Sequence, residues 1–209
     1  MTIMNYFTKE HEMFRESLRD FLNKEVKDNI DKWESDQKIP KDIWKKMGDQ
    51  GFLGLTYPEK YGGFDLDFFF EVILFEEMSK MNSGGFVITQ QVVQSMSSPY
   101  ILKYGSEFLK ERYLPGIISG DDIWAFAYAE PQGRYNLNDL STTASLEGDN
   151  YVINGYKSVV SGGPWANKFI VSVRTSGEQR DADGISLLIV NKDTDGLSVC
   201  LLYTSPSPR

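Results

Sequence analysis

Ser119-Gly-Asp-Asp-Ile-Trp-Ala-Phe-Ala-Tyr-Ala-Glu-Pro131 is the stretch in which the spacing of apolar residues changes. Before it, apolar residues recur every three or four positions, as they do on one face of an α-helix. After it, they alternate with polar residues or form short apolar runs, which is typical of β-strands. A helical block followed by a β block predicts an α+β protein with two domains, residues 1–122 and residues 123–199.

The first block predicts several helices. Thr8 is expected to cap the first of them, because a threonine side chain can accept a hydrogen bond from the first helical turn. Pro40 is expected to open a second helix that ends by Gly51, since the fixed φ of proline suits a first turn. Residues 68–78 are apolar on nearly every side, which favours a helix buried inside a bundle. Two further helical segments are expected, one over residues 86–104 that is interrupted at Pro99, and one that Ser106 caps and Pro115 follows.

The second block predicts strands at residues 124–129, 169–173 and 185–190. A hairpin is expected between residues 151–153 and residues 156–161. Asn154-Gly155 separates these two runs, and Asn-Gly is the strongest short-range signal for a hairpin turn.

Composition excludes several classes of function. The net charge is −8 and the acidic residues are scattered, whereas a nucleic-acid-binding face needs a concentrated patch of Lys and Arg. With one histidine, His11, and one cysteine, Cys200, the chain predicts neither a metal centre nor a disulfide. No apolar stretch reaches the ~20 residues of a membrane span, and the N-terminus lacks a signal-peptide pattern. A cytoplasmic location is therefore expected.

Gly51-Phe-Leu-Gly-Leu-Thr-Tyr-Pro-Glu-Lys-Tyr-Gly-Gly63 is the first of several motifs spread along the chain. The others are Glu76-Glu77, Lys103-Tyr-Gly105, Arg112-Tyr-Leu-Pro115, Ala127-Tyr-Ala-Glu-Pro131, Thr142-Thr-Ala144 and Gly148-Asp-Asn-Tyr-Val-Ile-Asn-Gly-Tyr-Lys157. In order and spacing these motifs resemble acyl-CoA dehydrogenases, whose signature GxxGxxxPExYGG the first motif nearly matches. The residues that follow Glu130, together with Lys157-Ser-Val-Val160, look like the divergent branch that includes pimeloyl-CoA dehydrogenase small subunits.

The resemblance implies a fold. It is an all-α helical bundle followed by an antiparallel β-barrel or sandwich-like domain, which here is expected to stop incomplete near Val199. Residues 200–209 abandon the strand pattern and resemble the translated read-through of a sequencing adapter, so we expect a non-native tail; the alternative is a genuine disordered tail. The glycines of Tyr61-Gly-Gly63 are expected to form a corner between helices rather than a phosphate cradle.

The resemblance also implies an FAD site. In the family, a strand ending in Thr-Glu-Pro lies against the flavin ring, a Gly-Ser-Asp contacts the pyrophosphate and the substrate, and a Trp-Ile-Thr covers the ring. Here Ala129 stands at the first Thr position, Arg134-Tyr135-Asn136 replace Gly-Ser-Asp, and Val159-Val160-Ser161 replace Trp-Ile-Thr. The expected cofactor-binding residues are Phe126, Tyr128, Ala129, Arg134, Tyr135, Val159 and Ser161.

In the family, a glutamate takes the α-proton of an acyl-CoA thioester while the β-hydride passes to the flavin, giving a trans-2-enoyl-CoA. That glutamate belongs to a C-terminal helical domain that this chain does not contain. We therefore expect no catalytic residue among the 209 residues, and no activity from them alone. The resemblance further implies an electron-transfer flavoprotein as electron acceptor and a homo- or hetero-oligomer.

Other interpretations stay open at this point. The chain could belong to a non-catalytic partner subunit of a heteromeric dehydrogenase, or to a flavin oxidase or monooxygenase of the same fold. Glu76 and Glu77 could be paired acid–base groups, but one exposed glutamate and one bonded inside the bundle is the favoured reading.

Overall fold

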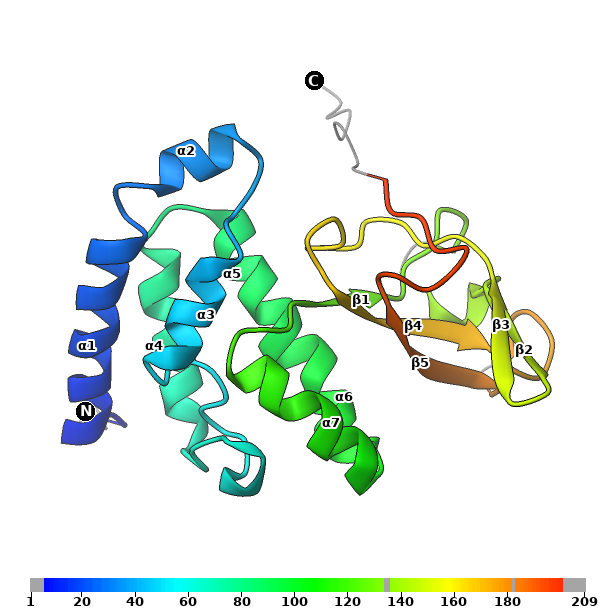
Figure 1. The fold of residues 1–209 in the computed structure, drawn as a ribbon, viewed down its shortest axis with the longest axis horizontal. Coiled ribbons are helices and arrows are strands. Elements are labelled where there is room, and N and C mark those ends of the chain that lie inside the picture. The colour runs from blue at the N-terminus through cyan, green and yellow to red at the C-terminus, as the bar shows by residue number, and fades with distance from the viewer. Residues whose placement is uncertain (1–5, 134–135, 182, 201–209) are drawn as a thin grey trace, which may run out of the picture. The chain divides into compact units, whose positions relative to one another are not determined.

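The structure is a computed structural model that describes residues 6–133, 136–181 and 183–200. Contacts divide the chain into two compact units, and the division falls between Asp122 and Ile123. The first unit is helical and the second is built on a β-sheet (Figure 1). The predicted fold class, a helical domain followed by a β-domain, is confirmed.

The helical unit contains α1 (Lys9–Glu25), α2 (Ile30–Ser35), α3 (Asp42–Asp49), a short 3-10 turn (Glu59–Tyr61), α4 (Phe68–Ser79), α5 (Gly84–Gln91), a π-helical segment (Val92–Ser97), α6 (Ser98–Tyr104) and α7 (Glu107–Ile118). Helix α4 packs between α1 and α5, and α6 packs against α7. The largest fully buried side chains of this unit are Leu18, Leu22, Met47, Leu55, Tyr57, Ile73, Leu74, Met78, Phe86, Leu114 and Ile117.

Helix α1 begins where the sequence predicts. The hydroxyl of Thr8 accepts a hydrogen bond from the backbone N–H of His11, and the ring nitrogen Nδ1 of His11 accepts one from the backbone N–H of Thr8, at 2.9 Å. The other ring nitrogen lies 3.0 Å from the carboxylate of Asp67, which caps α4. The histidine therefore joins two helix N-termini, and a structural role accounts for it.

Two proline predictions are wrong. Pro40 does not open α3, which begins at Asp42 after Lys41 as its cap. Pro115 does not follow α7 but lies inside it, although proline in a helix interior costs ~3 kcal/mol. Leu114 and Ile117 on either side of it are buried, and this packing keeps the last turn helical.

Tyr57, from the Gly51–Gly63 motif, is bound to the π-helical segment. Its hydroxyl lies 3.1 Å from the backbone oxygen of Gln94 and 2.5 Å from the hydroxyl of Ser98. Burial raises the pKa of Tyr57, so its hydroxyl stays protonated and can donate. Because π-helical turns leave backbone oxygens without their usual α-helical partners, a buried donor at this place stabilises the wide turn.

We expect Tyr57→Phe to lower the free energy of unfolding by about 1–2 kcal/mol, because Gln94 then keeps a buried backbone oxygen with one donor fewer. Urea denaturation measures the change. Tyr104→Phe is the matched control and should have no effect, since the Tyr104 side chain is 70% exposed. Equal stability of both variants would show that the Tyr57 hydroxyl does not support the π-helical segment.

The Tyr61-Gly-Gly63 corner is formed as predicted. Gly62 ends the 3-10 turn in the left-handed region, with φ 95°. Gly63 passes so close to Tyr57 that an added Cβ would lie 2.1 Å from its backbone oxygen. Gly62 is therefore required because of its left-handed backbone conformation. Gly63 is required because the backbone passes too close to Tyr57 to leave room for a side chain.

The β unit contains β1 (Trp124–Ala127), β2 (Thr143–Glu147), β3 (Asn150–Asn154), β4 (Lys168–Arg174) and β5 (Ile185–Asn191) in one sheet. Strand β4 is central: it pairs in parallel with β1 and with the start of β2, and antiparallel with β5. The sheet is thus mixed rather than wholly antiparallel, and within the described residues it is not closed into a barrel. The predicted strands at residues 124–129, 169–173 and 185–190 correspond to β1, β4 and β5.

The predicted Asn154-Gly155 hairpin is wrong. The hairpin instead joins β2 to β3, with Glu147 opposite Asn150. Gly148 supplies its turn with φ 62°, which suits glycine at the first position of a two-residue loop. Gly155 has a different role, because an added Cβ there would lie 2.3 Å from the hydroxyl oxygen of Thr142.

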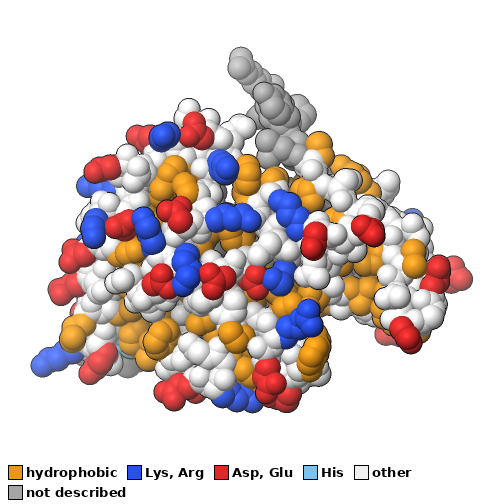
Figure 2. Space-filling model, viewed as in Figure 1, with side chains coloured by type: hydrophobic (Ala, Val, Ile, Leu, Met, Phe, Trp, Pro, Cys, Tyr) orange, Lys and Arg blue, Asp and Glu red, His pale blue; other side chains and the backbone are white. Residues whose placement is uncertain are grey.

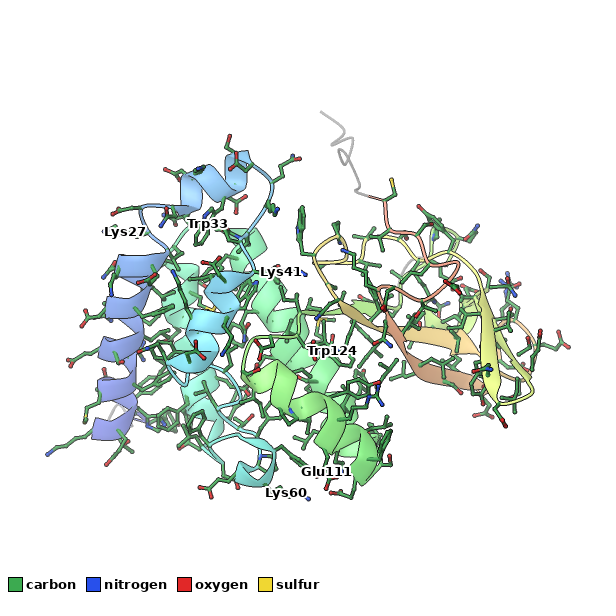
Figure 3. The ribbon with its side chains drawn as sticks, viewed as in Figure 1. Lys27, Trp33, Lys41, Lys60, Glu111 and Trp124 are labelled. Atoms are coloured by element: carbon green, nitrogen blue, oxygen red, sulfur yellow. The ribbon has the colours of Figure 1, made fainter. Side chains whose placement is uncertain are left out.

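A small core holds the sheet. Ala125, Ala166 and Phe169 are buried together, with Val160 and Val190 packed against them. Trp124, labelled in Figure 3, begins β1 and is fully buried. Because successive side chains of a strand point to opposite faces, Ala125 and Ala127 share one face of β1, and Trp124 and Phe126 share the other; of these four only Phe126 is half-buried.

Candidate functional site

The predicted cofactor residues Phe126, Tyr128 and Ala129 lie at the carboxyl end of β1 or just beyond it. The rings of Phe126 and Tyr128 are half-buried and stacked, with centroids 5.1 Å apart and planes 26° from parallel. Ala129 is 3% exposed, so the methyl group at this position is inside the unit. The alternation of the strand thus presents two aromatic rings on the face opposite the alanines.

Val159 and Ser161, the other predicted cofactor residues that the structure describes, belong to a stretch that lies next to this strand end. The backbone N–H of Ser158 donates to the carbonyl oxygen of Ala129 at 2.9 Å. Val159 follows with its side chain 61% exposed, and Ser161 is exposed. The structure therefore brings Ala129 together with the stretch that carries Val159 and Ser161. Arg134 and Tyr135 lie outside the described residues.

Val159 adopts a strained backbone conformation, with φ 53°. A β-branched residue is rarely found there, because its Cβ crowds the neighbouring carbonyl oxygen. Backbone strain of this kind gathers at functional sites. Its position beside Ser158 and Ser161 agrees with a functional role for the stretch.

We expect Val159→Asn to raise the free energy of unfolding by about 1 kcal/mol, because asparagine tolerates the left-handed region and little apolar burial is lost. Urea denaturation of the variant checks this. The same change at Val152, within β3, should be destabilising, since asparagine is unfavourable in strands. A loss of stability in Val159→Asn would contradict the left-handed conformation.

Glu130 is 2% exposed and its carboxylate accepts four hydrogen bonds. The backbone N–H and hydroxyl of Ser141 donate to one oxygen, at 2.7 and 2.5 Å. The backbone N–H of Thr142 and the ammonium of Lys157 donate to the other, at 2.9 and 2.8 Å. Burial would raise the pKa of Glu130, but the bonds from Lys157, Ser141 and Thr142 outweigh it and hold the pKa at about 2. Glu130 is a fixed anion rather than a general base.

Lys157 completes this cluster. Its ammonium also lies 3.2 Å from the hydroxyl of Ser172 and 3.5 Å from the backbone oxygen of Tyr128. Burial lowers the pKa of Lys157 although Glu130 opposes this. Each of the three N–H bonds of the ammonium therefore has an acceptor within hydrogen-bond distance.

The Glu76-Glu77 pair is structural in the way the sequence favours. Glu77 is 1% exposed and pairs with Arg15, Arg19 and Lys80, whereas the Glu76 side chain is 48% exposed and pairs with Arg15. Two carboxylates held in this way by cations are not poised to exchange protons.

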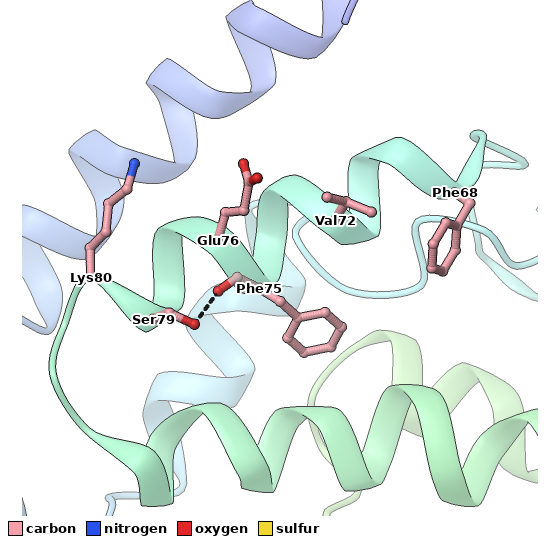
Figure 4. Close-up of a pocket in the computed structure, with 6 residues that line it drawn as sticks. All are labelled: Phe68, Val72, Phe75, Glu76, Ser79 and Lys80. Carbon is pink, nitrogen blue, oxygen red and sulfur yellow. Dashed lines mark hydrogen bonds between the residues drawn. The ribbon is translucent and has the colours of Figure 1, made fainter. Parts of the chain in front are cut away.

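A shallow groove runs along α4, lined by Phe68, Val72, Phe75, Glu76, Ser79 and Lys80 (Figure 4). Glu76 and Lys80 point toward α1, and Phe75 points to the opposite side. Ser79 is occupied in a hydrogen bond to the backbone oxygen of Phe75. The groove contains none of the predicted cofactor residues and offers no group free for proton transfer.

Other kinds of site find no support within the described part of the chain. It contains no group of three or more His, Cys, Asp and Glu side chains placed to hold a metal ion. None of its helices is both long and apolar enough to cross a membrane. On the face shown in Figure 2, Lys and Arg side chains are interspersed with Asp and Glu.

Two family models match the chain in sequence. The acyl-CoA dehydrogenase N-terminal domain matches residues 8–121, and the acyl-CoA dehydrogenase middle domain matches residues 125–207. The chain belongs to the acyl-CoA dehydrogenase family. The resemblance inferred from the Gly51–Gly63 signature and the later motifs is thereby confirmed.

Among the relatives of this acyl-CoA dehydrogenase chain, one is named as a reductase and another as a dehydrogenase. It is 33% identical over 193 residues to a 3-(aryl)acrylate reductase of Clostridium sporogenes, covering 92% of this chain and 51% of the relative. It is 34% identical over 197 residues to the mitochondrial long-chain specific acyl-CoA dehydrogenase of Sus scrofa, covering 93% of this chain and 45% of the relative. The chain thus spans about half the length of the curated relatives it matches.

The chain also matches solved structures of acyl-CoA dehydrogenases. The crystal structure of an acyl-CoA dehydrogenase from Geobacillus kaustophilus aligns with a TM-score of 0.88 and 37% identity, covering 92% of this chain and 50% of that one. An acyl-CoA dehydrogenase from Bacillus anthracis, complexed with FAD, aligns with a TM-score of 0.84 and 31% identity, covering 100% of this chain and 34% of that one.

Sequence patterns did not single out two buried charges, Lys157 and Arg174. Arg174 is 6% exposed, and its guanidinium contacts the backbone oxygens of Asn138, Leu140, Asp181 and Asp183. The available signal was modest: Lys157 ends a family motif, and Arg174 directly follows an apolar run. A charge in such a place needs buried partners, but the sequence does not say which.

Proposed function

We propose that this chain is the helical domain and the first part of the β-domain of an FAD-dependent acyl-CoA dehydrogenase. The whole protein would oxidise an acyl-CoA thioester to a trans-2-enoyl-CoA. The observation that carries the proposal is the meeting of the β1 end with residues 157–161 through the Ser158 to Ala129 hydrogen bond. In a chain of this family, that meeting joins the two stretches expected to contact the flavin.

The residues present fit a flat, partly polar ring system. Phe126 and Tyr128 form a half-buried aromatic surface, and Ser161 adds an exposed hydroxyl. Aromatic rings stack on such surfaces, and a hydroxyl can bond a ring nitrogen. The proposed cofactor contacts remain Phe126, Tyr128, Ala129, Arg134, Tyr135, Val159 and Ser161.

Bound FAD would supply the hydride acceptor of this reaction. The residues of this chain would bind and orient the flavin and exclude water from it. No proton-transfer role is proposed for Glu77 or Glu130, because every contact of these carboxylates is with a cation, a hydroxyl or a backbone N–H. The catalytic base is proposed to lie in sequence beyond this chain.

The proposal includes the remaining sequence-based expectations. Residues 1–122 and 123–199 are the two domains, and residues 200–209, of which only Cys200 is among the described residues, are a non-native tail. The substrate is an acyl-CoA, the electron acceptor is an electron-transfer flavoprotein, and the protein is a cytoplasmic homo- or hetero-oligomer. The 209-residue chain alone is inactive.

The test is to express the protein from its complete reading frame and to purify it. We expect stoichiometric bound FAD whose absorption is bleached anaerobically by a saturated acyl-CoA. Reoxidation of the reduced flavin by oxygen that outpaces reoxidation by an electron-transfer flavoprotein would favour an oxidase or monooxygenase instead. Reoxidation by an aryl-acrylate would favour the direction of the Clostridium sporogenes relative.

A non-catalytic partner subunit is the second candidate. Ala129 has no hydroxyl and its methyl group is buried, and Val159 replaces the aromatic residue that covers the ring in the family. These two positions favour a weakened site. Purification without flavin, together with restored activity on mixing with a flavin-containing homologue, would support this candidate over the first.

A further inference from the structure

The carboxylate of Glu130 binds the segment that leads into β2. It receives the backbone N–H groups of Ser141 and Thr142. Glu130, which follows the end of β1, and residues 141–142 are thereby held together.

Lys157 connects the same carboxylate to the second cofactor stretch. Its side chain is 10% exposed, and its ammonium lies 2.8 Å from Glu130. The next residue, Ser158, donates its backbone N–H to Ala129, and Val159 then takes the strained left-handed conformation. A strained residue persists only where its surroundings hold it in place. Here Lys157 on one side and Val160, packed against the core, on the other hold the segment.

Arg174 holds the same segment, residues 138–142. Its guanidinium contacts the backbone oxygens of Leu140 and Asn138, each at 3.4 Å, and its backbone N–H donates to the backbone oxygen of Thr142 at 2.8 Å. The carboxylate therefore binds backbone N–H groups of this segment, and Arg174 binds its carbonyl groups. The two charges fix complementary groups of one short segment.

We propose that Glu130 and Lys157 are positioning residues that hold the end of β1 and residues 157–161 in place for FAD. The inference rests on the proposed function. It differs from a proton-transfer role, because four donors occupy the Glu130 carboxylate and three acceptors surround the Lys157 ammonium. It also differs from simple stabilisation, because the cluster binds the two cofactor stretches themselves.

The first measurement needs no cofactor. Hydrogen exchange of the 209-residue chain should quicken by about tenfold at the amides of Ser141, Thr142 and Ser158 in Glu130→Gln and in Lys157→Met. The Gln amide would turn a donor toward donors, and Met removes the ammonium. Glu147→Gln, an exposed glutamate on β2, is the matched control and should leave these amides unchanged.

The second measurement separates positioning from stability. The double variant Glu130→Met, Lys157→Met replaces a buried ion pair by apolar side chains, a change that often preserves overall stability. We expect the double variant to reverse most of the decrease in the midpoint of thermal unfolding that the single variants show. The acceptor for the Ser141 and Thr142 amides stays absent, so their exchange should remain fast. FAD affinity of the protein from the complete reading frame should stay about tenfold or more below that of the unaltered protein.

The results distinguish the two proposals. FAD affinity that recovers together with thermal stability in the double variant would overturn the positioning role, and so would unchanged exchange at Ser141 and Thr142 in Glu130→Gln. Lack of FAD binding by the unaltered protein would contradict the proposed function instead. Low FAD affinity at normal thermal stability would support positioning.

Discussion

Replacing Glu77 with alanine is expected to lower the free energy of unfolding of the helical unit by about 3 kcal/mol at neutral pH. Glu77 is buried and receives Arg19 through two hydrogen bonds, at 3.0 and 3.1 Å, as well as Arg15 at 3.1 Å and Lys80 at 2.6 Å. Alanine would remove the shared anion and leave Arg15, whose side chain is 12% exposed, with its charge nearly buried. Chemical denaturation followed by circular dichroism measures the change.

Glu76→Ala is the matched control. The neighbouring side chain is 48% exposed and pairs with Arg15, so its loss should cost less than about 1 kcal/mol. Similar costs for the two variants would contradict the view that burial of Glu77 makes the difference.

The effect of Glu77→Ala should depend on pH. Burial would raise the pKa of Glu77, but hydrogen bonds from Arg19, Lys80 and Arg15 outweigh it and hold the pKa at about 2. A carboxyl whose pKa is lower in the folded state stabilises the fold above its unfolded pKa, and the stabilisation is lost as the pH falls toward the folded value. The difference between wild type and variant should therefore be complete above pH ~5 and vanish near pH ~2. A difference that grows on acidification would contradict this assignment.

Replacing Arg174 with methionine is expected to lower the free energy of unfolding of the β unit by about 3 kcal/mol, because buried backbone oxygens would lose a charged donor. The guanidinium contacts Asp183 at 3.0 Å and Asp181 at 3.3 Å through their backbone oxygens, in addition to Asn138 and Leu140. Methionine keeps much of the apolar stem but donates nothing. Urea denaturation measures the loss.

Arg180→Met serves as the control for Arg174→Met. The Arg180 side chain is 83% exposed and its ion pair with Asp139 spans 3.4 Å, so its removal should change stability by less than about 0.5 kcal/mol. Hydrogen exchange should additionally show the loop around Leu140 loosened in Arg174→Met and unchanged in Arg180→Met. Equal stability of the two variants would mean that Arg174 does not carry the loop.

Local signals in the sequence were sufficient where one side chain or one spacing decides the outcome. Thr8 caps α1 because its hydroxyl reaches the N–H three residues on, which depends on nearby residues alone. Strands β4 and β5 could likewise be identified from their apolar runs, and α1 from its helical spacing. The ordered motifs extended this to the family.

Local signals failed where a distant partner competes with them. Asn154-Gly155 is an ideal hairpin turn by its composition, but Thr142 crowds Gly155, and the turn forms at Gly148 instead. Pro115 should end a helix, but burial of Leu114 and Ile117 continues α7 through it. In both cases packing between segments far apart in the sequence outweighs a local preference of a few kcal/mol.

The division into a helical block and a β block, the family and the choice of the proposed cofactor stretches follow from the amino-acid sequence, because periodicity and motif spacing are properties of the chain alone. The tertiary structure decides the roles of the charges. Glu77 becomes the anion of three cations and Glu130 the anchor of a loop, because each is buried where only those partners can satisfy it. A buried charge takes its function from the groups that fold around it, and these groups come from residues as much as 62 positions apart.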